Sequence, residues 1–128
     1  MAARGRSILY ALEGLRFLVR NEHNAWIHAL VSLSVVGAGG ILQISANDWR
    51  WIVVSIGLVW IGEALNTAVE QLCNLVSPQP HPLIKASKDV AAGAVLICAV
   101  TAAIIGGLTF YPYFGDEGGL ICGGYGAE

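Results

Sequence analysis

The chain has 128 residues, of which 55% are hydrophobic and only 12% carry a formal charge. Soluble domains contain about 25% charged residues, so this composition excludes an ordinary soluble domain and indicates one small membrane domain. The net charge of −2 argues against nucleic acid as a partner.

The amino-terminal segment, residues 6–20, predicts an amphipathic helix. Its apolar residues include Ile8, Leu12 and Leu15, which share one helical face. Its arginines suit anionic lipid headgroups, so we expect this helix to lie on the membrane surface. The same charges exclude a cleavable signal, whose core must be apolar.

Three apolar segments follow, and each is about long enough to cross a bilayer: residues 26–44, 52–76 and 90–110. We therefore expect an all-α integral membrane protein with an amino-terminal surface helix and three transmembrane helices. Clusters of small residues at 37–40 and 91–94 are expected to allow close packing between helices.

Short connectors are predicted between these spans. Residues 46–51 join the first two, and the proline-rich residues 77–82 open the second connector. The membrane domain is expected to occupy residues 1–112. Residues 113–128 form a Gly-rich acidic tail that we expect to be disordered and dispensable.

The basic residues predict the orientation. Four arginines precede the first span, Lys85 and Lys88 lie between the second and third, and only Arg50 lies on the other side. Since positive residues concentrate in cytoplasmic segments, the amino terminus and the second connector are expected to be cytoplasmic.

Two carboxylates, Glu63 and Glu70, lie inside the otherwise apolar second span. A carboxylate in hydrocarbon costs a few kcal/mol, so such residues usually face a protein interior or a polar cavity. The two are seven residues apart, roughly 10 Å along a helix, and share a face with Asn66, Thr67 and Asn74. This polar stripe is typical of a functional surface and not of a lipid-facing one.

On the predicted topology, Glu22, Lys88 and Asp89 lie on the same cytoplasmic side as the stripe. Carboxylate oxygens suit Mg²⁺, which is usually held by one or two carboxylates together with substrate phosphates. A lysine counters phosphate charge, and a buried carboxylate can act as a general base. These are the components of phosphoryl transfer from a cytoplasmic donor to a lipid alcohol. The sequence contains no Walker A motif, so a soluble P-loop kinase is excluded.

Four short motifs stand out along the chain: Gly14-Leu-Arg16, Asn21-Glu22, Glu63-Ala-Leu-Asn66-Thr67-Ala-Val-Glu70, and Lys88-Asp89. This set resembles the prokaryotic diacylglycerol kinase family over residues 10–111. The resemblance implies a lipid kinase of the bacterial inner membrane that uses ATP and Mg²⁺. It also implies a homotrimer whose active sites are shared between neighbouring subunits.

By that resemblance, Glu63 is the base for the lipid hydroxyl, and Asn66 positions it. Glu22 and Glu70 bind the metal that bridges the ATP phosphates. The positions implied to contact ATP are Tyr10, Glu22, Glu70, Gln79, His81, Lys88 and Asp89. Asn74 replaces an acid that is common in the family, which leaves the role of that acid open.

The family has two substrate branches, diacylglycerol and undecaprenol. Residues 21–28 resemble the undecaprenol branch, because the enteric diacylglycerol enzymes tend to carry an acid at the position of His28. The sequence therefore favours a polyprenol acceptor and leaves diacylglycerol open.

Each of these residues also has a structural alternative. Glu63 and Glu70 can form a polar pair that ties helices together, and Glu22 can cap a helix start. His28 is expected to be a packing or interface residue without a direct chemical role. Two other functions stay open: a small proton-coupled transporter and a non-catalytic assembly subunit. A transporter needs no nucleotide and does not account for the charged residues gathered on one side.

Overall fold

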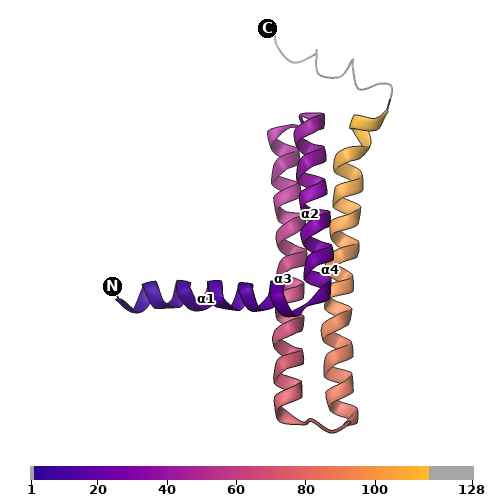
Figure 1. The fold of residues 1–128 in the computed structure, drawn as a ribbon. Coiled ribbons are helices and arrows are strands. Elements are labelled where there is room, and N and C mark those ends of the chain that lie inside the picture. Colours follow the sequence, from indigo (N-terminus) through magenta and orange to yellow (C-terminus); the bar gives the residue numbers. More distant parts are fainter. Residues whose placement is uncertain (1, 116–128) are drawn as a thin grey trace, which may run out of the picture.

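The computed structural model describes residues 2–115, which form four helices in the order α1 (Ala2–Asn21), α2 (His23–Leu42), α3 (Ala46–Val76) and α4 (Pro82–Phe114). Helices α2, α3 and α4 lie side by side, and α1 projects sideways from the bundle at the start of α2 (Figure 1). The last three are long and apolar enough to cross a membrane. The predicted fold class is confirmed.

Helix α3 begins earlier than predicted because of a cap at its start. Ser45 is the N-cap, and its Oγ accepts a hydrogen bond from the backbone N–H of Asp48 at 3.2 Å. A serine in this position satisfies one of the free N–H groups of the first turn. The prediction that residues 46–51 form a connector is therefore wrong, and the turn between α2 and α3 is limited to residues 43–45.

Helix α4 also extends beyond its predicted span. His81 is its N-cap, since its Nδ1 accepts a hydrogen bond from the N–H of Leu83 at 3.2 Å, and Pro82 occupies the first turn, where proline is tolerated. Lys88 and Asp89 therefore lie within α4, and the connector is only residues 77–81. At its other end α4 continues past Pro112 to Phe114. The first two residues of the predicted tail are thus helical, and residues 116–128 lie outside the described part of the chain.

A small polar cluster explains why α4 stays ordered past its proline. The hydroxyl of Tyr113 donates to Asp48 Oδ2 at 2.6 Å, and Ser45 Oγ donates to the same oxygen at 2.6 Å. The backbone N–H of Ser45 donates to the Tyr113 hydroxyl at 3.0 Å. These bonds tie the end of α4 to the start of α3.

The three bundle helices differ in length, and this difference positions the site. The 20 residues of α2 span about 30 Å, which matches the hydrocarbon core of a bilayer. The 31 residues of α3 and the 33 of α4 span about 46 and 50 Å. Both helices continue past the level of α1 and are joined there by the connector (Figure 1). With α1 on the membrane surface, as its sequence pattern predicts, these ends reach into water.

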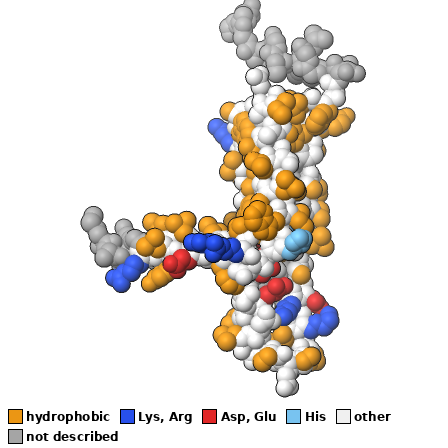
Figure 2. Space-filling model, viewed as in Figure 1, with side chains coloured by type: hydrophobic (Ala, Val, Ile, Leu, Met, Phe, Trp, Pro, Cys, Tyr) orange, Lys and Arg blue, Asp and Glu red, His pale blue; other side chains and the backbone are white. Residues whose placement is uncertain are grey.

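The surface agrees with this division. Hydrophobic side chains cover much of the part of the bundle above α1 in the view of Figure 2, and charged side chains gather on α1 and on the ends of α3 and α4 below it. Large apolar side chains such as Leu30 in α2 and Leu108 in α4 are exposed in the single chain. Such surfaces suit lipid or neighbouring protein.

Helices α3 and α4 approach each other closely at Gly62. A Cβ atom at this position would lie 3.1 Å from Cys98 Sγ, so the absence of a side chain allows the contact. The sequence did not single out this glycine. Within α2, Gly39 packs against Trp49 of α3, where a Cβ would lie 3.0 Å from the ring. At the other small-residue positions expected to pack closely, a Cβ atom would meet only open space in the single chain: Gly37, Gly40 and Gly93.

We expect Gly62→Ala to lower stability, because the added methyl group pushes Cys98 and separates α3 from α4. The free energy of unfolding should fall by about 1–2 kcal/mol relative to Gly57→Ala, a matched control on α3 with nothing within 4 Å of its Cβ position. Thermal unfolding in detergent measures both variants. Adding Cys98→Ala should restore much of the loss. Equal stability of Gly62→Ala and Gly57→Ala would contradict the close contact.

Candidate active site

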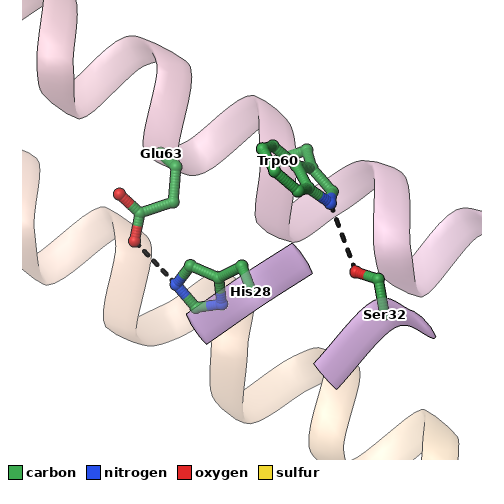
Figure 3. A network of polar contacts seen from close by, with 4 residues as sticks. All are labelled: His28, Ser32, Trp60 and Glu63. Carbon is green, nitrogen blue, oxygen red and sulfur yellow. Dashed lines mark hydrogen bonds and ion pairs between the residues drawn. The ribbon is translucent and has the colours of Figure 1, made fainter. Parts of the chain in front are cut away.

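Glu63 lies in the middle of α3 and is almost fully buried, with 2% of its surface exposed. Its Oε1 lies 2.7 Å from His28 Nε2, which comes from α2 (Figure 3). His28, expected to be a packing or interface residue, thus forms a hydrogen bond across the contact between α2 and α3. The two residues are 35 positions apart, so spacing does not reveal the pair. The available signal was that His28 is the only titratable side chain in the first predicted span.

A second hydrogen bond joins the same two helices one turn away. Trp60 Nε1 on α3 donates to Ser32 Oγ on α2 at 3.2 Å. Ser32 follows His28 by four residues and Trp60 precedes Glu63 by three, so both pairs lie on facing sides of the two helices (Figure 3). This bond is a second, separate contact between α2 and α3.

The next turn of α3 carries two unusual polar atoms. Asn66 Oδ1 and Thr67 Oγ1 are buried, and neither has a hydrogen-bond partner among the described residues. Most buried polar atoms in native proteins are paired, so orphaned atoms beside Glu63 mark a place where a ligand or a neighbouring chain completes the bonding.

Exposure increases along the polar stripe of α3. Glu63 and Thr67 are buried, Glu70 is half-buried and Asn74 is exposed. Counted from the start of α3, Glu63 lies about 26 Å along the axis and Glu70 about 36 Å. Since the hydrocarbon core is about 30 Å thick, a core that begins at the start of α3 would include Glu63 near its far edge and would end before Glu70.

A polar pocket of about 740 Å³ lies around the connector between α3 and α4, and we call it the connector pocket. Lys88 Nζ donates to Asn74 Oδ1 at 2.7 Å across this pocket, and Lys85 forms an ion pair with Asp89 one turn apart on α4. Four of the positions implied to contact ATP line the pocket together: Gln79, His81, Lys88 and Asp89.

Three of the implied ATP positions do not line this pocket: Tyr10, Glu22 and Glu70. Tyr10 is exposed on α1, and Glu22 is half-buried at the junction of α1 and α2; neither lines the connector pocket. Glu22 occupies the N-cap position of α2, but its side chain makes no capping hydrogen bond. Capping therefore does not explain this glutamate.

The donor chemistry of Glu22 and Glu70 fits a hard divalent cation. Neither carboxylate has a hydrogen bond or an ion pair with another described side chain. Over the same part of the chain, three or more His, Cys, Asp or Glu side chains do not come together at one point. Mg²⁺ does not require such a cluster, because it typically uses one or two carboxylates and completes its shell with phosphate oxygens and water.

An apolar groove of about 610 Å³ runs between α2 and α4 along α3. Its lining is mostly aliphatic, as at Val35, Ile56 and Ala103, but His28 also lines it. The groove therefore leads from the apolar part of the bundle to the His28–Glu63 pair. The buried carboxylate thus lies between an apolar groove on one side and, further along α3, a polar pocket on the other.

Comparisons with known proteins agree with this arrangement. The family described as prokaryotic diacylglycerol kinase matches residues 9–110, well over half of the chain. The undecaprenol kinase of Bacillus subtilis (strain 168) is 39% identical over 107 residues, covering 84% of this chain and 87% of the relative. A diacylglycerol kinase of Synechocystis sp. is 36% identical over 83% of this chain and 61% of its own length. The diacylglycerol kinase of Escherichia coli (strain K12) is 29% identical over 83% and 87%.

These relatives are kinases that act on lipids, and the comparisons give no support to a proton-coupled transporter. The three apolar helices place the catalytic chain in a membrane. The chain belongs to the prokaryotic diacylglycerol kinase family and is a membrane lipid kinase that uses ATP as co-substrate.

Proposed function

We propose that this protein transfers the γ-phosphoryl group of ATP to the hydroxyl of undecaprenol at the inner face of the bacterial inner membrane. The observation that carries the proposal is the buried carboxylate of Glu63 between the apolar groove and the polar end of α3. The choice of acceptor is supported by the 39% identity to an undecaprenol kinase, against 29% to the diacylglycerol kinase of Escherichia coli. Diacylglycerol is the alternative acceptor.

In this proposal Glu63 is the general base, and Asn66 positions the acceptor. The polyprenyl chain lies in the apolar groove, which brings its terminal hydroxyl to Glu63. The hydroxyl proton moves to the carboxylate as the hydroxyl oxygen bonds to the γ-phosphorus. The bond between that phosphorus and the β–γ bridging oxygen breaks, and ADP leaves. The position of Glu63 in an apolar segment supports the role, since exclusion of water strengthens its interaction with the reacting hydroxyl.

Glu22 and Glu70 would hold Mg²⁺ through their unpaired carboxylates. When bound, the ion would neutralise part of the negative charge of the ATP phosphates. Lys88, Asp89, Gln79 and the other positions implied by the family resemblance would contact ATP in and around the connector pocket. The free space there and the lysine at its wall support this assignment.

We further propose that the protein is a homotrimer and that neighbouring subunits share each active site. The separation of Tyr10 and Glu22 from the connector pocket in one chain supports this, because a second chain can supply what the first lacks. The exposed apolar surfaces of α2 and α4 provide area for such contacts. The concentration of basic residues supports a cytoplasmic amino terminus and a cytoplasmic connector.

Transfer of labelled phosphate tests the proposal directly. Purified protein in lipid–detergent micelles is given γ-labelled ATP, Mg²⁺ and either undecaprenol or diacylglycerol. We expect label in undecaprenyl phosphate at a higher kcat/KM than in phosphatidic acid. Preference for diacylglycerol would overturn the choice of acceptor alone, and the absence of label in both lipids would overturn the activity.

Glu63→Gln should reduce kcat by at least about 100-fold, because the amide cannot take the hydroxyl proton. Binding of a fluorescent ATP analogue should stay unchanged. Glu70→Gln should instead weaken binding of the analogue in the presence of Mg²⁺. Wild-type turnover by Glu63→Gln would show that the base is another group.

Asn74→Asp should raise the KM for ATP by about two- to five-fold, because a carboxylate would neutralise the Lys88 ammonium that the asparagine leaves charged. The effect should shrink at high salt, where an exposed ion pair is screened. Asn74→Ala is the matched control and should keep a KM near that of the wild type. A KM for ATP that is the same in Asn74→Asp and Asn74→Ala would argue against phosphate contact by Lys88.

A further inference from the structure

The His28–Glu63 pair has features that simple helix packing does not require. The Glu63 side chain is 3% exposed and that of His28 20%, so the bond is shielded from water on the glutamate side and reaches the apolar groove on the histidine side. The bond occupies Oε1 of the carboxylate and leaves Oε2 without a partner among the described residues. Oε1 of Glu63 is therefore held by His28, and Oε2 is available to accept a hydrogen bond or a proton from another group.

Within the described part of the chain, His28 is the only side chain that hydrogen-bonds to Glu63. An ionised carboxylate in an apolar segment is strongly disfavoured unless a donor compensates it. A ring N–H donated to a carboxylate forms a charge-assisted bond, which is stronger than a bond between neutral groups. The imidazole is therefore placed to hold one oxygen of the buried carboxylate in a fixed position.

Other titratable groups around the pair do not take this role. On α4, Cys98 packs against Gly62, the neighbour of Glu63. Five other charged or titratable side chains lie near the pair along helices α1, α2 and α3. They are Arg16 and Arg20 at the end of α1, Glu22 and His23 at the start of α2, and Glu70 on α3. None of them bonds to Glu63 or His28 in the part of the chain that the structure describes.

We propose that His28 is a positioning residue for the phosphoryl-transfer step: its Nε2–H holds Glu63 Oε1 in place and directs Oε2 toward the acceptor hydroxyl. This inference rests on the proposed role of Glu63 as the base. The hydroxyl proton moves to Oε2, the hydroxyl oxygen bonds to the γ-phosphorus and ADP leaves, while the His28 proton stays on Nε2. His28 itself exchanges no proton with the substrate.

The test compares three variants by kcat, by KM for ATP and by the pH dependence of kcat in micelles. His28→Ala removes the donor, and His28→Gln supplies an amide N–H in its place. Trp60→Phe is the matched control, because it removes the other hydrogen bond between α2 and α3 and leaves Glu63 untouched. Thermal unfolding and binding of an ATP analogue check that each variant is folded.

For His28→Ala we expect kcat to fall by about 10- to 100-fold, the loss typical of a hydrogen bond to a charged group, with the KM for ATP within two-fold of the wild type. The pH profile of its kcat should also differ from that of the wild type, because the base has lost its hydrogen-bond partner. His28→Gln should recover part of kcat, and Trp60→Phe should keep the wild-type pH profile.

An unchanged kcat and pH profile in His28→Ala, with Glu63→Gln inactive, would overturn the inference and leave Glu63 as the base. Equal losses in His28→Ala and Trp60→Phe would also overturn it, since the helix contact and not the donor would then matter. An active Glu63→Gln would instead refute the proposed function. If His28→Ala does not fold, His28→Gln is the test. A wild-type pH profile in His28→Gln, together with a kcat below that of Trp60→Phe, supports the inference. A change in the KM for ATP of His28→Gln without a change in its kcat overturns it.

Discussion

The free-energy cost of a carboxylate in hydrocarbon governs the design of this bundle. Glu63 is tolerated in a membrane-spanning helix because α2 supplies His28 as a partner and because the surrounding helices bury it. The contact between α2 and α3 is therefore more than packing. The Trp60–Ser32 bond joins the same two helices one turn away. An apolar groove and a polar stripe can then meet at a single buried acid.

The unequal helix lengths separate two environments along one axis. Helix α2 is only as long as the hydrocarbon core, whereas α3 and α4 extend beyond it by several turns. The apolar substrate and the charged co-substrate of a lipid kinase have opposite solvent preferences. A helical hairpin that crosses the boundary offers each a place at a different level along its length.

Much of this arrangement could be predicted from the sequence, because it depends on local pattern. The apolar segments predicted three spans, and the spacing of Glu63, Asn66 and Glu70 predicted one polar face. The helix starts were missed because Ser45 and His81 act through capping bonds that apolar periodicity does not report. The pairing of His28 with Glu63 depends on the rotation and depth of two helices, which no spacing along the chain encodes. The close contact at Gly62 was missed for the same reason.

The central claim is that ATP binds at the aqueous ends of α3 and α4 with its terminal phosphate directed at the buried acid. An experimental structure of the assembled protein with Mg²⁺ and a non-hydrolysable ATP analogue tests this most directly. The account predicts the metal on Glu22 and Glu70, from one subunit or two, phosphate oxygens beside Lys88, and the γ-phosphate facing Glu63. A nucleotide bound away from these side chains, or Glu22 and Glu70 on surfaces that cannot meet in the assembly, would contradict it.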